Sequence, residues 1–528
     1  LDRDSCKGVN KLAIMFFTNM PEVVNINSKI PLFQIDVSTG QSETNKSIRA
    51  KTVQLAASLK CAGLKPGDVT LLVAPNSLHL AHALFAGMLN GFPLLPLDPS
   101  LLQLEIEDFV NKTNPKVIYC CKENAHIVET IVKKNGNIIK IVLDDPANDI
   151  DAFVKKYNTT NDDCKAFVPA KVDKLAPAWM LATSGTTGKS KVVVMNHDNT
   201  WFNQKMFNFH YDKLPSPLRS IFIVSSPQWM TGISLYTCTS LLVITRLVSS
   251  APLTAELSKQ TFQKYKPSFI LCSPTKLLEL QNANCDFSSL DRAMIGGSAL
   301  IESSEKSLRE KFPKVKYLPA YGMTETLTIA LCTGPNNPTL SLGKEFNTGF
   351  EYRLVDHATG KIITEPNVPG EMQLKSESKF VGYLNNPEET ALIKTKDGFV
   401  KTGDLIYKNR DGYYFFVERL KVALKYKTFQ VYPTEIEFVL CSHEAVAGAG
   451  VVGLPDIECG DKPLAFVVKK DGYEVTAKEL CDFVASKLSD AKKLRGGIIF
   501  VKELPLTPSA KLNRGKLKEM IDKTKIEF

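Results

Sequence analysis

The sequence lacks any run of about 18 uninterrupted apolar residues, the length that a membrane-spanning helix requires, so we expect no membrane span. It also lacks a concentrated basic arm. The 65 Lys and Arg residues are spread along the chain among 56 Asp and Glu residues, which leaves a net charge of +9. A diffuse positive charge is compatible with a small anionic ligand and does not indicate nucleic acid, so we expect no nucleic-acid partner.

Metal-type cysteine spacing is also missing. The 12 cysteines are scattered, and the only close pair is the adjacent Cys120 and Cys121. This distribution is typical of reduced, buried thiols in an intracellular protein. The last residues, 525–528, read Lys-Ile-Glu-Phe and not the peroxisomal Ser-Lys-Leu. We expect a cytoplasmic monomer; because the chain starts at Leu1, a removed signal peptide stays an open alternative.

Length and composition indicate a globular protein of two or more domains. At about 150 residues per domain, 528 residues exceed one ordinary core. With 44% hydrophobic and 23% charged residues, the composition is that of an ordinary folded protein. There are no internal repeats and no low-complexity tract, so a solenoid or a disordered array is not indicated.

Helical and strand patterns alternate over most of the chain. A helix is predicted at residues 47–62 and another at 80–90, and strands are predicted at 69–74, 93–97, 116–120 and 138–143. The same alternation resumes later, with predicted strands at 220–225, 241–248, 268–272, 292–296 and 315–319. Alternating strands and helices predict parallel sheets covered on both faces, hence two α/β-layered subdomains.

The last third of the chain has a different texture. Short strands and Gly, Pro and Asn turns between residues 340 and 414 predict a small β-rich subdomain. The final hundred residues predict a compact α+β unit with helices at 477–488 and from residue 514. The expected fold is therefore α/β, with a large ATP- and acyl-binding domain at residues 1–417 and a small mobile α+β domain at residues 418–528.

One stretch has the composition of a phosphate-binding loop. Residues 179–191 read WMLATSGTTGKSK, an apolar strand that leads into a loop of small and hydroxyl-bearing residues ending in lysines. Small residues let backbone N–H groups approach phosphate oxygens, and hydroxyl and ammonium groups add donors. The same composition is also typical of an ordinary flexible turn.

A Walker-type phosphate loop is excluded here. That motif requires a glycine five positions before its final Gly-Lys pair, but Thr183 occupies this position, and Gly185 is too close to Gly188. The loop would have to hold phosphate in another way.

Four further stretches place small or polar residues just after a strand or in a turn: Gly296 to Ala299, Ala320 to Glu325, Lys401 to Asp404, and Pro505 to Lys511. Open α/β sheets bind ligands at the carboxyl ends of their strands. Each stretch alone is equally typical of a surface turn. Together they offer a phosphate grip, an aromatic platform, a ribose acceptor, an acidic metal ligand and a lysine, the parts that an ATP-dependent attack on the α-phosphorus requires.

Six motifs carry a family resemblance. TSGTTGKSK, GGSAL, YGMTE, KTGDL, ERLKVALKYKTFQVYPTEIE and PLTPSAKLNR follow one another in the order and at the intervals of the adenylate-forming superfamily. The sequence therefore resembles acyl-CoA synthetases, coumarate-CoA ligases and insect luciferases over nearly its whole length.

The resemblance implies a role for each matching position. The loop around the β- and γ-phosphates of ATP would be Ser184, Gly185, Thr186, Thr187, Gly188 and Lys191, and adenine would be held by Gly297, Ser298, Tyr321 and Gly322. Thr324 would contact the α-phosphate, Glu325 would hold Mg²⁺, and Asp404 and Arg419 would bind ribose. Lys511 would serve adenylation. Rotation of the small domain about Glu418 would then bring Lys425 into the site for the second step.

The sequence also departs from the family pattern. Ser190 replaces a proline, Val192, Thr428 and Ala510 replace glycines, and Glu418 stands where Asp is commoner. The wall of the acyl pocket would include Trp229, Met230 and Gly297. Trp229 and Met230 would narrow it, although a simple core role is an equally good interpretation of both.

Three functions fit this sequence. The first is an acyl-CoA ligase of the insect luciferase-like branch, which would use Mg²⁺, ATP and CoA on a small carboxylic acid. The second is a luciferase-type monooxygenase, in which O₂ attacks the adenylate. The third is a binding homologue without catalysis. The sequence does not identify the acid, because pocket walls come from dispersed positions.

Overall fold

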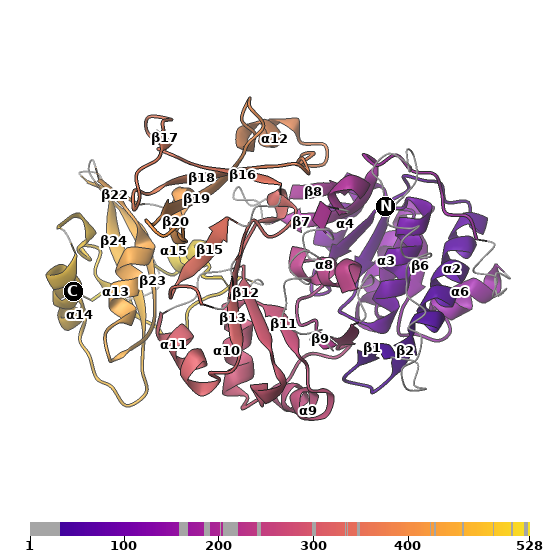
Figure 1. The fold of residues 1–528 in the computed structure, drawn as a ribbon, viewed down its shortest axis with the longest axis horizontal. Helices are drawn as coiled ribbons and strands as arrows, with labels where there is room; N and C mark the ends of the chain where they lie inside the picture. The colour runs from indigo at the N-terminus through magenta and orange to yellow at the C-terminus, as the bar shows by residue number, and fades with distance from the viewer. Residues whose placement is uncertain are drawn as a thin grey trace.

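The computed structural model describes residues 32–157, 167–183, 191–200, 202–203, 220–239, 244–297, 302–332, 334, 336–345, 349–422, 424–426, 429–456, 459–488, 490–507, 511–521 and 526–527. These residues form three β-sheets with helices packed around them (Figure 1). The large N-terminal domain holds two of the sheets and the small C-terminal domain holds the third, which confirms the predicted fold class.

The first sheet has the strand order β6-β5-β3-β4-β7-β8. Its strands are β3 (Thr70–Val73), β4 (Leu94–Leu97), β5 (Val117–Cys120), β6 (Ile139–Val142), β7 (Pro177–Thr183) and β8 (Lys191–Asn196). The helices of this region are α2 (Asn45–Cys61), α3 (Leu78–Asn90), α4 (Gln103–Thr113), α5 (Ala125–Asn135) and α6 (Ile150–Lys156). The pairs are parallel except for the β7–β8 hairpin, so the phosphate-loop stretch joins two antiparallel strands.

The second sheet begins with six strands in the order β13-β12-β11-β9-β10-β1, all paired in parallel. They are β1 (Leu32–Asp36), β9 (Ser220–Phe222), β10 (Thr245–Val248), β11 (Phe269–Cys272), β12 (Arg292–Gly296) and β13 (Lys316–Tyr321). Four helices accompany them: α8 (Met230–Thr239), α9 (Ala255–Tyr265), α10 (Pro274–Asn282) and α11 (Glu302–Lys311). The short strand β2 (Ser42–Thr44) pairs antiparallel with β1 at the far edge.

The predicted β-rich subdomain is confirmed, and its strands continue the second sheet. Antiparallel pairs connect β13 to β14 (Leu331–Cys332) and β14 to β15 (Ser341–Glu345). Beyond β15 follow β20 (Tyr414–Arg419), β19 (Val400–Lys408), β18 (Gly370–Ser376), β16 (Phe350–Val355) and β17 (Ile362–Ile363), with helix α12 (Pro387–Ile393) beside them. The carboxyl end of β13 therefore lies close to the β19–β20 hairpin.

The small domain has its own sheet and its own apolar core. Its strands are β21 (Leu424–Tyr426), β22 (Phe429–Val431), β23 (Val446–Asp456), β24 (Gly460–Lys469) and β25 (Ile498–Phe500), and its helices are α13 (Pro433–Cys441), α14 (Ala477–Lys487) and α15 (Arg514–Ile521). Within the described ranges, no helix combines the length and the apolar character that crossing a membrane requires. The boundary between residues 417 and 418 stays a prediction.

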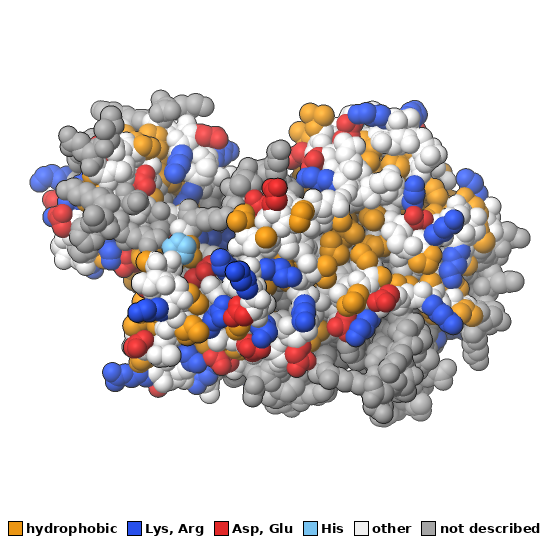
Figure 2. Space-filling model, turned by 90° about the horizontal axis from the view of Figure 1, so that it is seen from above, with side chains coloured by type: hydrophobic (Ala, Val, Ile, Leu, Met, Phe, Trp, Pro, Cys, Tyr) orange, Lys and Arg blue, Asp and Glu red, His pale blue; other side chains and the backbone are white. Residues whose placement is uncertain are grey.

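The described surface carries charges of both signs. On the face that Figure 2 shows, Lys and Arg side chains are interspersed with Asp and Glu side chains over the visible described residues.

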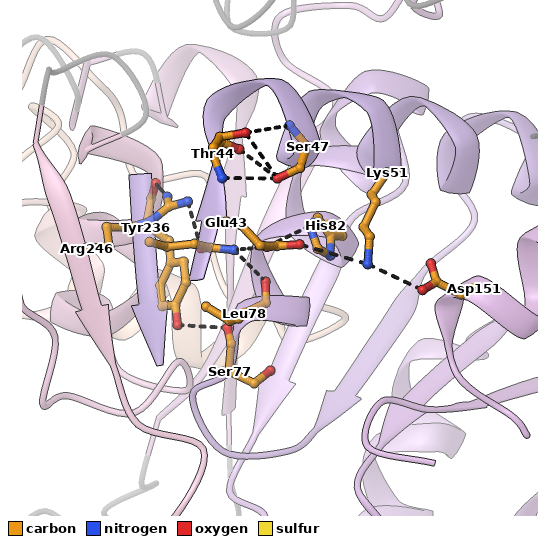
Figure 3. Close-up of polar contacts among 11 residues, drawn as sticks. Glu43, Thr44, Ser47, Lys51, Ser77, Leu78, His82, Asp151, Tyr236 and Arg246 are labelled. Carbon is orange, nitrogen blue, oxygen red and sulfur yellow. Dashed lines mark hydrogen bonds and ion pairs between the residues drawn. The ribbon is translucent and has the colours of Figure 1, made fainter. Parts of the chain in front are cut away.

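A buried polar network ties the N-terminal strand pair to the body of the large domain (Figure 3). Gln34 Nε2 donates to Glu43 Oε2 at 2.5 Å and to Leu78 O at 3.0 Å. Arg246 Nη2 donates to Gln34 Oε1 at 3.0 Å, and His82 Nε2 lies 3.3 Å from Glu43 Oε2. Since these residues come from β1, β2, α3 and β10, the network links the second sheet to a helix of the first.

Glu43→Gln is expected to destabilise the large domain by about 1–3 kcal/mol at neutral pH, because a charge-assisted bond in a buried site is lost. Burial alone would raise the pKa of Glu43, but the contact with His82 and the bond from Gln34 lower it from 4.5 to about 2. The carboxylate therefore stabilises the fold above pH 4.5, and this contribution is lost as the pH falls towards 2. Thermal unfolding measured at several pH values should show the wild type and the variant converging in acid.

The matched control is Glu123→Gln, at an exposed position of the same domain. It should change stability by less than about 0.5 kcal/mol at any of these pH values. A Glu43 variant as stable as this control at neutral pH would contradict the stabilising role of the network.

Candidate functional site

A cavity of about 2430 Å³ runs along the central strands of the second sheet and includes their carboxyl ends. Its lining comes from strands β11 to β13 with helix α8, from the ends of the β7–β8 hairpin with helix α12, from the β19–β20 hairpin, and from the small domain, including residues 504, 506, 507, 511 and 512. Parallel strands bring their carboxyl ends to one edge, where ligands bind in open α/β sheets. The cavity thus lies where the sequence predicts a site.

Two glycine positions shape the floor of this cavity. Gly297 follows β12 with a φ of +91°, and no atom lies within 4 Å of the place a Cβ would take, so bare backbone faces open space. A Cβ on Gly322 would lie 2.6 Å from Thr328 O, so this turn has no room for a side chain. A flat ring can approach such a backbone closely. Ser298, which was predicted beside Gly297, lies outside the described residues.

Tyr321, Asp404 and Arg419 form one cluster between β13 and the β19–β20 hairpin. Tyr321 Oη donates to Asp404 Oδ2 at 2.7 Å, and Arg419 Nε lies 2.9 Å from Asp404 Oδ1. Asp404 is only 3% exposed. Burial and the neighbouring Asp404 carboxylate raise the pKa of Tyr321, and that carboxylate raises the pKa of Arg419. At neutral pH the tyrosine is therefore protonated and the arginine charged.

A second carboxylate, that of Glu325, also lines the cavity. It belongs to the short helix η3 (Thr324–Thr326) that follows β13, and it is 8% exposed. Its Oε1 accepts a hydrogen bond of 2.7 Å from Tyr383 Oη. Burial and the Glu325 carboxylate raise the pKa of Tyr383, so the tyrosine stays a donor. Thr324 and Tyr383 also line the cavity, and Tyr383 is a residue that the sequence motifs did not reveal.

The phosphate-loop stretch is described only at its two ends. Thr183 closes β7 and Lys191 opens β8, and both residues line the cavity. Lys191 Nζ is ion-paired with Glu389 of α12 and lies 5.0 Å from the centre of the Tyr383 ring. Residues Ser184, Gly185, Thr186, Thr187 and Gly188 lie outside the described residues, and their contact with phosphate stays a prediction.

Lys511 of the small domain reaches the same cavity. Its loop is closed by a bond of 2.7 Å from Thr507 N to Lys511 O and one of 3.1 Å from Lys511 N to Thr507 Oγ1. Loss of water around the ammonium group and the positive charge of Arg419 lower the pKa of Lys511, whereas the negative charge of Asp404 raises it. The lysine thus lies within electrostatic reach of the Asp404–Arg419 pair. The other predicted lysine, Lys425, lies in β21, paired with Gln430 across the β21–β22 hairpin.

Glu418 connects the two domains. It is 2% exposed, and its carboxylate accepts hydrogen bonds from Arg419 N at 2.9 Å and from Thr434 N at 3.0 Å. Arg514, which the sequence did not single out, lies 4.0 Å from Glu418 and binds both oxygens of Glu437 at 2.7 and 2.8 Å. The contacts of Glu418 with Thr434 and Arg514 therefore link the end of β20 to α13 and α15 of the small domain. The hinge itself stays a prediction.

The predicted acyl wall also faces the cavity. Trp229 and Met230, at the start of α8, are half-buried and line it. Met230 Sδ accepts from Ser234 Oγ at 3.3 Å, so the helix start is fixed by its own polar contacts. The same cavity continues between α8 and the second sheet past Leu271, Met294 and Leu318, which no motif marked. Contact of Trp229 and Met230 with a substrate stays a prediction.

Comparison with known proteins gives two family matches. The model of the AMP-binding enzyme family matches residues 27–384, and that of the AMP-binding enzyme C-terminal domain matches residues 435–511. The luciferin 4-monooxygenase of Photinus pyralis is 30% identical over 492 residues, which cover 90% of this chain and 88% of that protein. The peroxisomal OPC-8:0-CoA ligase 1 of Arabidopsis thaliana is 30% identical over 502 residues, covering 92% and 89%.

Solved structures of similar fold cover almost the whole chain. ATP-bound MatB from Rhodopseudomonas palustris superposes with a TM-score of 0.84 at 21% identity, covering 97% of this chain and 99% of that one. The anthranilate CoA ligase AuaEII in complex with anthranoyl-AMP gives a TM-score of 0.83 at 22% identity, with 96% of each chain covered. At this level of identity the likeness shows a shared fold.

Proposed function

Because the chain belongs to the AMP-binding enzyme family, we propose that it converts a carboxylic acid to an acyl-adenylate with Mg²⁺-ATP. The proteins similar to this chain include CoA ligases and luciferases. Pyrophosphate leaves in this first step; in the second, the CoA thiol takes the acyl group and AMP leaves. The observation that carries the proposal is that Lys511, from the small domain, lines the same cavity as Asp404 and Arg419, from the large domain.

The geometry supports nucleotide binding between β12, β13 and the β19–β20 hairpin. The open backbone at Gly297, with Ser298, Tyr321 and Gly322, would hold adenine. A carboxylate has about four acceptor sites, and Asp404 uses only part of them for Tyr321 and Arg419, so ribose hydroxyls can donate to it. Ser184 to Gly188 and Lys191 would hold the β- and γ-phosphates.

The residues present also fit Mg²⁺. Among the described residues, no group of three His, Cys, Asp or Glu side chains could hold a metal by itself, so Glu325 would need ligands from outside such a group. Mg²⁺ is commonly held by one or two carboxylates together with substrate phosphates and water. Glu325 would therefore hold Mg²⁺ only with ATP, and the ion would neutralise charge on the phosphates. Thr324, the adjacent residue, would contact the α-phosphate.

The chemistry explains why a lysine of the small domain is needed. A carboxylate that attacks the α-phosphorus brings two anions together, so positive charge must lie where negative charge accumulates in the transition state. Lys511 can supply it at the cavity edge. Lys425 lies on a different element of the same domain, so one geometry would not serve both lysines, and a rotation about Glu418 would exchange them.

A luciferase is the second candidate, because a luciferin 4-monooxygenase is as similar to this chain as a plant CoA ligase is. Adenylation activates the carbon beside the carboxyl group as well as the carboxyl group itself. The same adenylate could therefore react with O₂ in place of CoA. The two candidates share their first step and differ only in the second.

One experiment tests the proposal and separates the candidates. The full chain is incubated with ATP, Mg²⁺ and a panel of aliphatic, aromatic and dicarboxylic acids, with and without CoA, while pyrophosphate, acyl-AMP, acyl-CoA and light are measured. Acid-dependent pyrophosphate release followed by acyl-CoA is expected. Light emission that needs no CoA would favour the luciferase, and absence of pyrophosphate release across the panel would refute adenylation.

Tyr383→Phe is expected to weaken Mg²⁺ activation about tenfold, because groups that orient a metal-bound carboxylate typically contribute a factor of this size. The Tyr383 hydroxyl is the donor that fixes Glu325 Oε1. The measurement is the Mg²⁺ concentration that half-saturates ATP–pyrophosphate exchange. Tyr407→Phe, at another tyrosine that lines the cavity but makes no bond to Glu325 among the described contacts, is the control. An unchanged Mg²⁺ dependence in Tyr383→Phe would show that Glu325 is not positioned through this bond.

A further inference from the structure

The acyl part of the cavity ends in a basic cluster. Across the second sheet, Leu271, Met294 and Leu318 lie side by side in register and line the cavity. Two residues earlier on the same three strands lie Phe269, Arg292 and Lys316, which are also in register and also line the cavity. Alternate residues of a strand face the same side, so the apolar row leads directly to the basic row.

The length of this path follows from strand geometry. Gly296 and Arg292 are the last and first residues of β12, four residues apart. At about 3.3 Å per residue, they are separated by ~13 Å along the strand. An acyl chain that runs along the sheet from the adenylation site beside Gly297 would therefore have to be of medium length to reach Arg292.

Positive charge exceeds negative charge at the end of the cavity that Arg292 and Lys316 line. Asp291 is the one carboxylate shared by two cations: Arg292 Nε lies 3.1 Å from its Oδ2, and Lys316 Nζ donates to its Oδ1 at 2.8 Å. Arg292 is 3% exposed, and its Nη1 atom is buried without a hydrogen-bond partner in the part of the chain that the structure describes. A buried donor of a charged group without a partner is costly, so an acceptor is expected there.

The acidic residues that line this part of the cavity, Glu279 and Glu305, are already paired with cations. Glu305 accepts two hydrogen bonds from Arg309, at 2.8 and 2.6 Å, and one from Leu340 N at 3.0 Å. Glu279 is ion-paired with Lys276. Neither is within ion-pair distance of Arg292 among the described contacts, so the cluster of Asp291, Arg292 and Lys316 keeps one positive charge in excess.

We propose that this cluster binds a second acidic group at the far end of the substrate, so that the preferred acids are medium-length α,ω-dicarboxylic acids. The inference rests on the proposed function, since it assigns a substrate class to the same cavity. A carboxylate on Arg292 would neutralise the excess charge and give Nη1 its acceptor. The apolar row between the two ends would contact the methylene chain.

The expected selectivity follows from the cost of an unpaired site. A pocket built to hydrogen-bond a polar group discriminates strongly against an analogue that lacks it. Lys316 is 34% exposed, so water can partly replace the missing group. We therefore expect a preference of roughly a hundredfold in kcat/KM for the diacid over the monoacid of the same length, below the largest values known for enclosed sites.

The test compares decanedioic acid with decanoic acid, which differ only in the terminal group. Acid-dependent pyrophosphate release is measured for the wild type, Arg292→Met and Arg292→Lys. The wild type should favour decanedioic acid, Arg292→Met should lose that preference while it keeps its activity on decanoic acid, and Arg292→Lys should be intermediate. Equal use of both acids by the wild type, or an equal loss of both in Arg292→Met, would overturn the proposal.

A binding measurement separates this inference from the proposed function. Decanoyl and ω-carboxynonanoyl sulfamoyl-adenosines mimic the two adenylates and need no turnover, so calorimetry reports the pocket alone. Tighter binding of the carboxylated analogue by the wild type, lost in Arg292→Met, would support the distal site even if no acid were turned over. Equal affinities, or binding of neither analogue, would refute it. If the variant does not fold, Lys316→Met tests the same cluster from its more exposed side.

Discussion

Lys511→Ala is expected to lower the rate of adenylate formation by roughly a thousandfold, while ATP still binds. The lysine reaches the cavity edge beside Asp404 and Arg419 from the small domain. Its positive charge is needed only when the carboxylate and the α-phosphate come together, so its loss should affect the transition state far more than the bound nucleotide. Acid-dependent ATP–pyrophosphate exchange measures the rate, and calorimetry measures ATP affinity.

Lys516→Ala provides the matched control, because Lys516 is an exposed lysine of α15 outside the cavity. It should leave exchange unchanged. Adenylation at a normal rate in Lys511→Ala would rule out the assigned role, and a parallel loss of ATP affinity would indicate that Lys511 only binds nucleotide.

The pH dependence gives a further check on Lys511. Loss of water around the ammonium group and the positive charge of Arg419 lower its pKa from 10.5. The protonated form is therefore lost at a lower pH than for a free lysine. The adenylation rate should therefore fall as the pH rises through this lowered pKa. Lys511→Arg keeps its charge at every accessible pH, and it should remove the alkaline decline even if its maximal rate is reduced.

Lys425→Ala is expected to leave adenylation intact and to slow acyl transfer to CoA by roughly a hundredfold. Lys425 belongs to β21, whereas Lys511 lies in the loop before α15, so the two lysines come from different elements of the small domain. If rotation about Glu418 exchanges them, each variant should damage one half-reaction only. Single-turnover measurements that follow acyl-AMP and acyl-CoA separately distinguish the two steps.

The pair of variants is more informative than either one. Opposite patterns, with Lys511→Ala impaired in the first step and Lys425→Ala in the second, would support the exchange of lysines. A Lys425 variant that fails in adenylation alone would contradict it. Lys487→Ala, at the end of α14, is the control for a general effect of removing a lysine from this domain.

Much of the fold follows from local patterns. The helix predicted at 47–62 is α2, at Asn45–Cys61, and the strand predicted at 292–296 is β12 with the same bounds. Apolar periodicity records which face of a segment is buried, and turns are marked by residues with special backbone freedom, so both can be read one segment at a time. The motifs that follow the strands are local in the same way.

Local sequence patterns did not predict which residues contact each other within the site. Tyr383 contacts Glu325 across 58 positions of sequence, and Arg514 contacts Glu437 across 77. Neither member of these pairs needs a particular neighbour in sequence, so no short pattern reveals the contact. The unpaired Nη1 of Arg292 is a similar case, because an arginine at the start of a strand is unremarkable until its surroundings are known.

The sequence by itself determined the α/β class, the order of the subdomains, the family resemblance and the ends of the strands where ligand chemistry is expected. Only the tertiary structure decided that β1 pairs with β10 at the far side of the second sheet, that Glu43 lies beside the buried His82, and that Arg292 lines the cavity. The reason is physical: local segments report their own burial, whereas the partner of a buried charge is chosen by the packing of the whole chain.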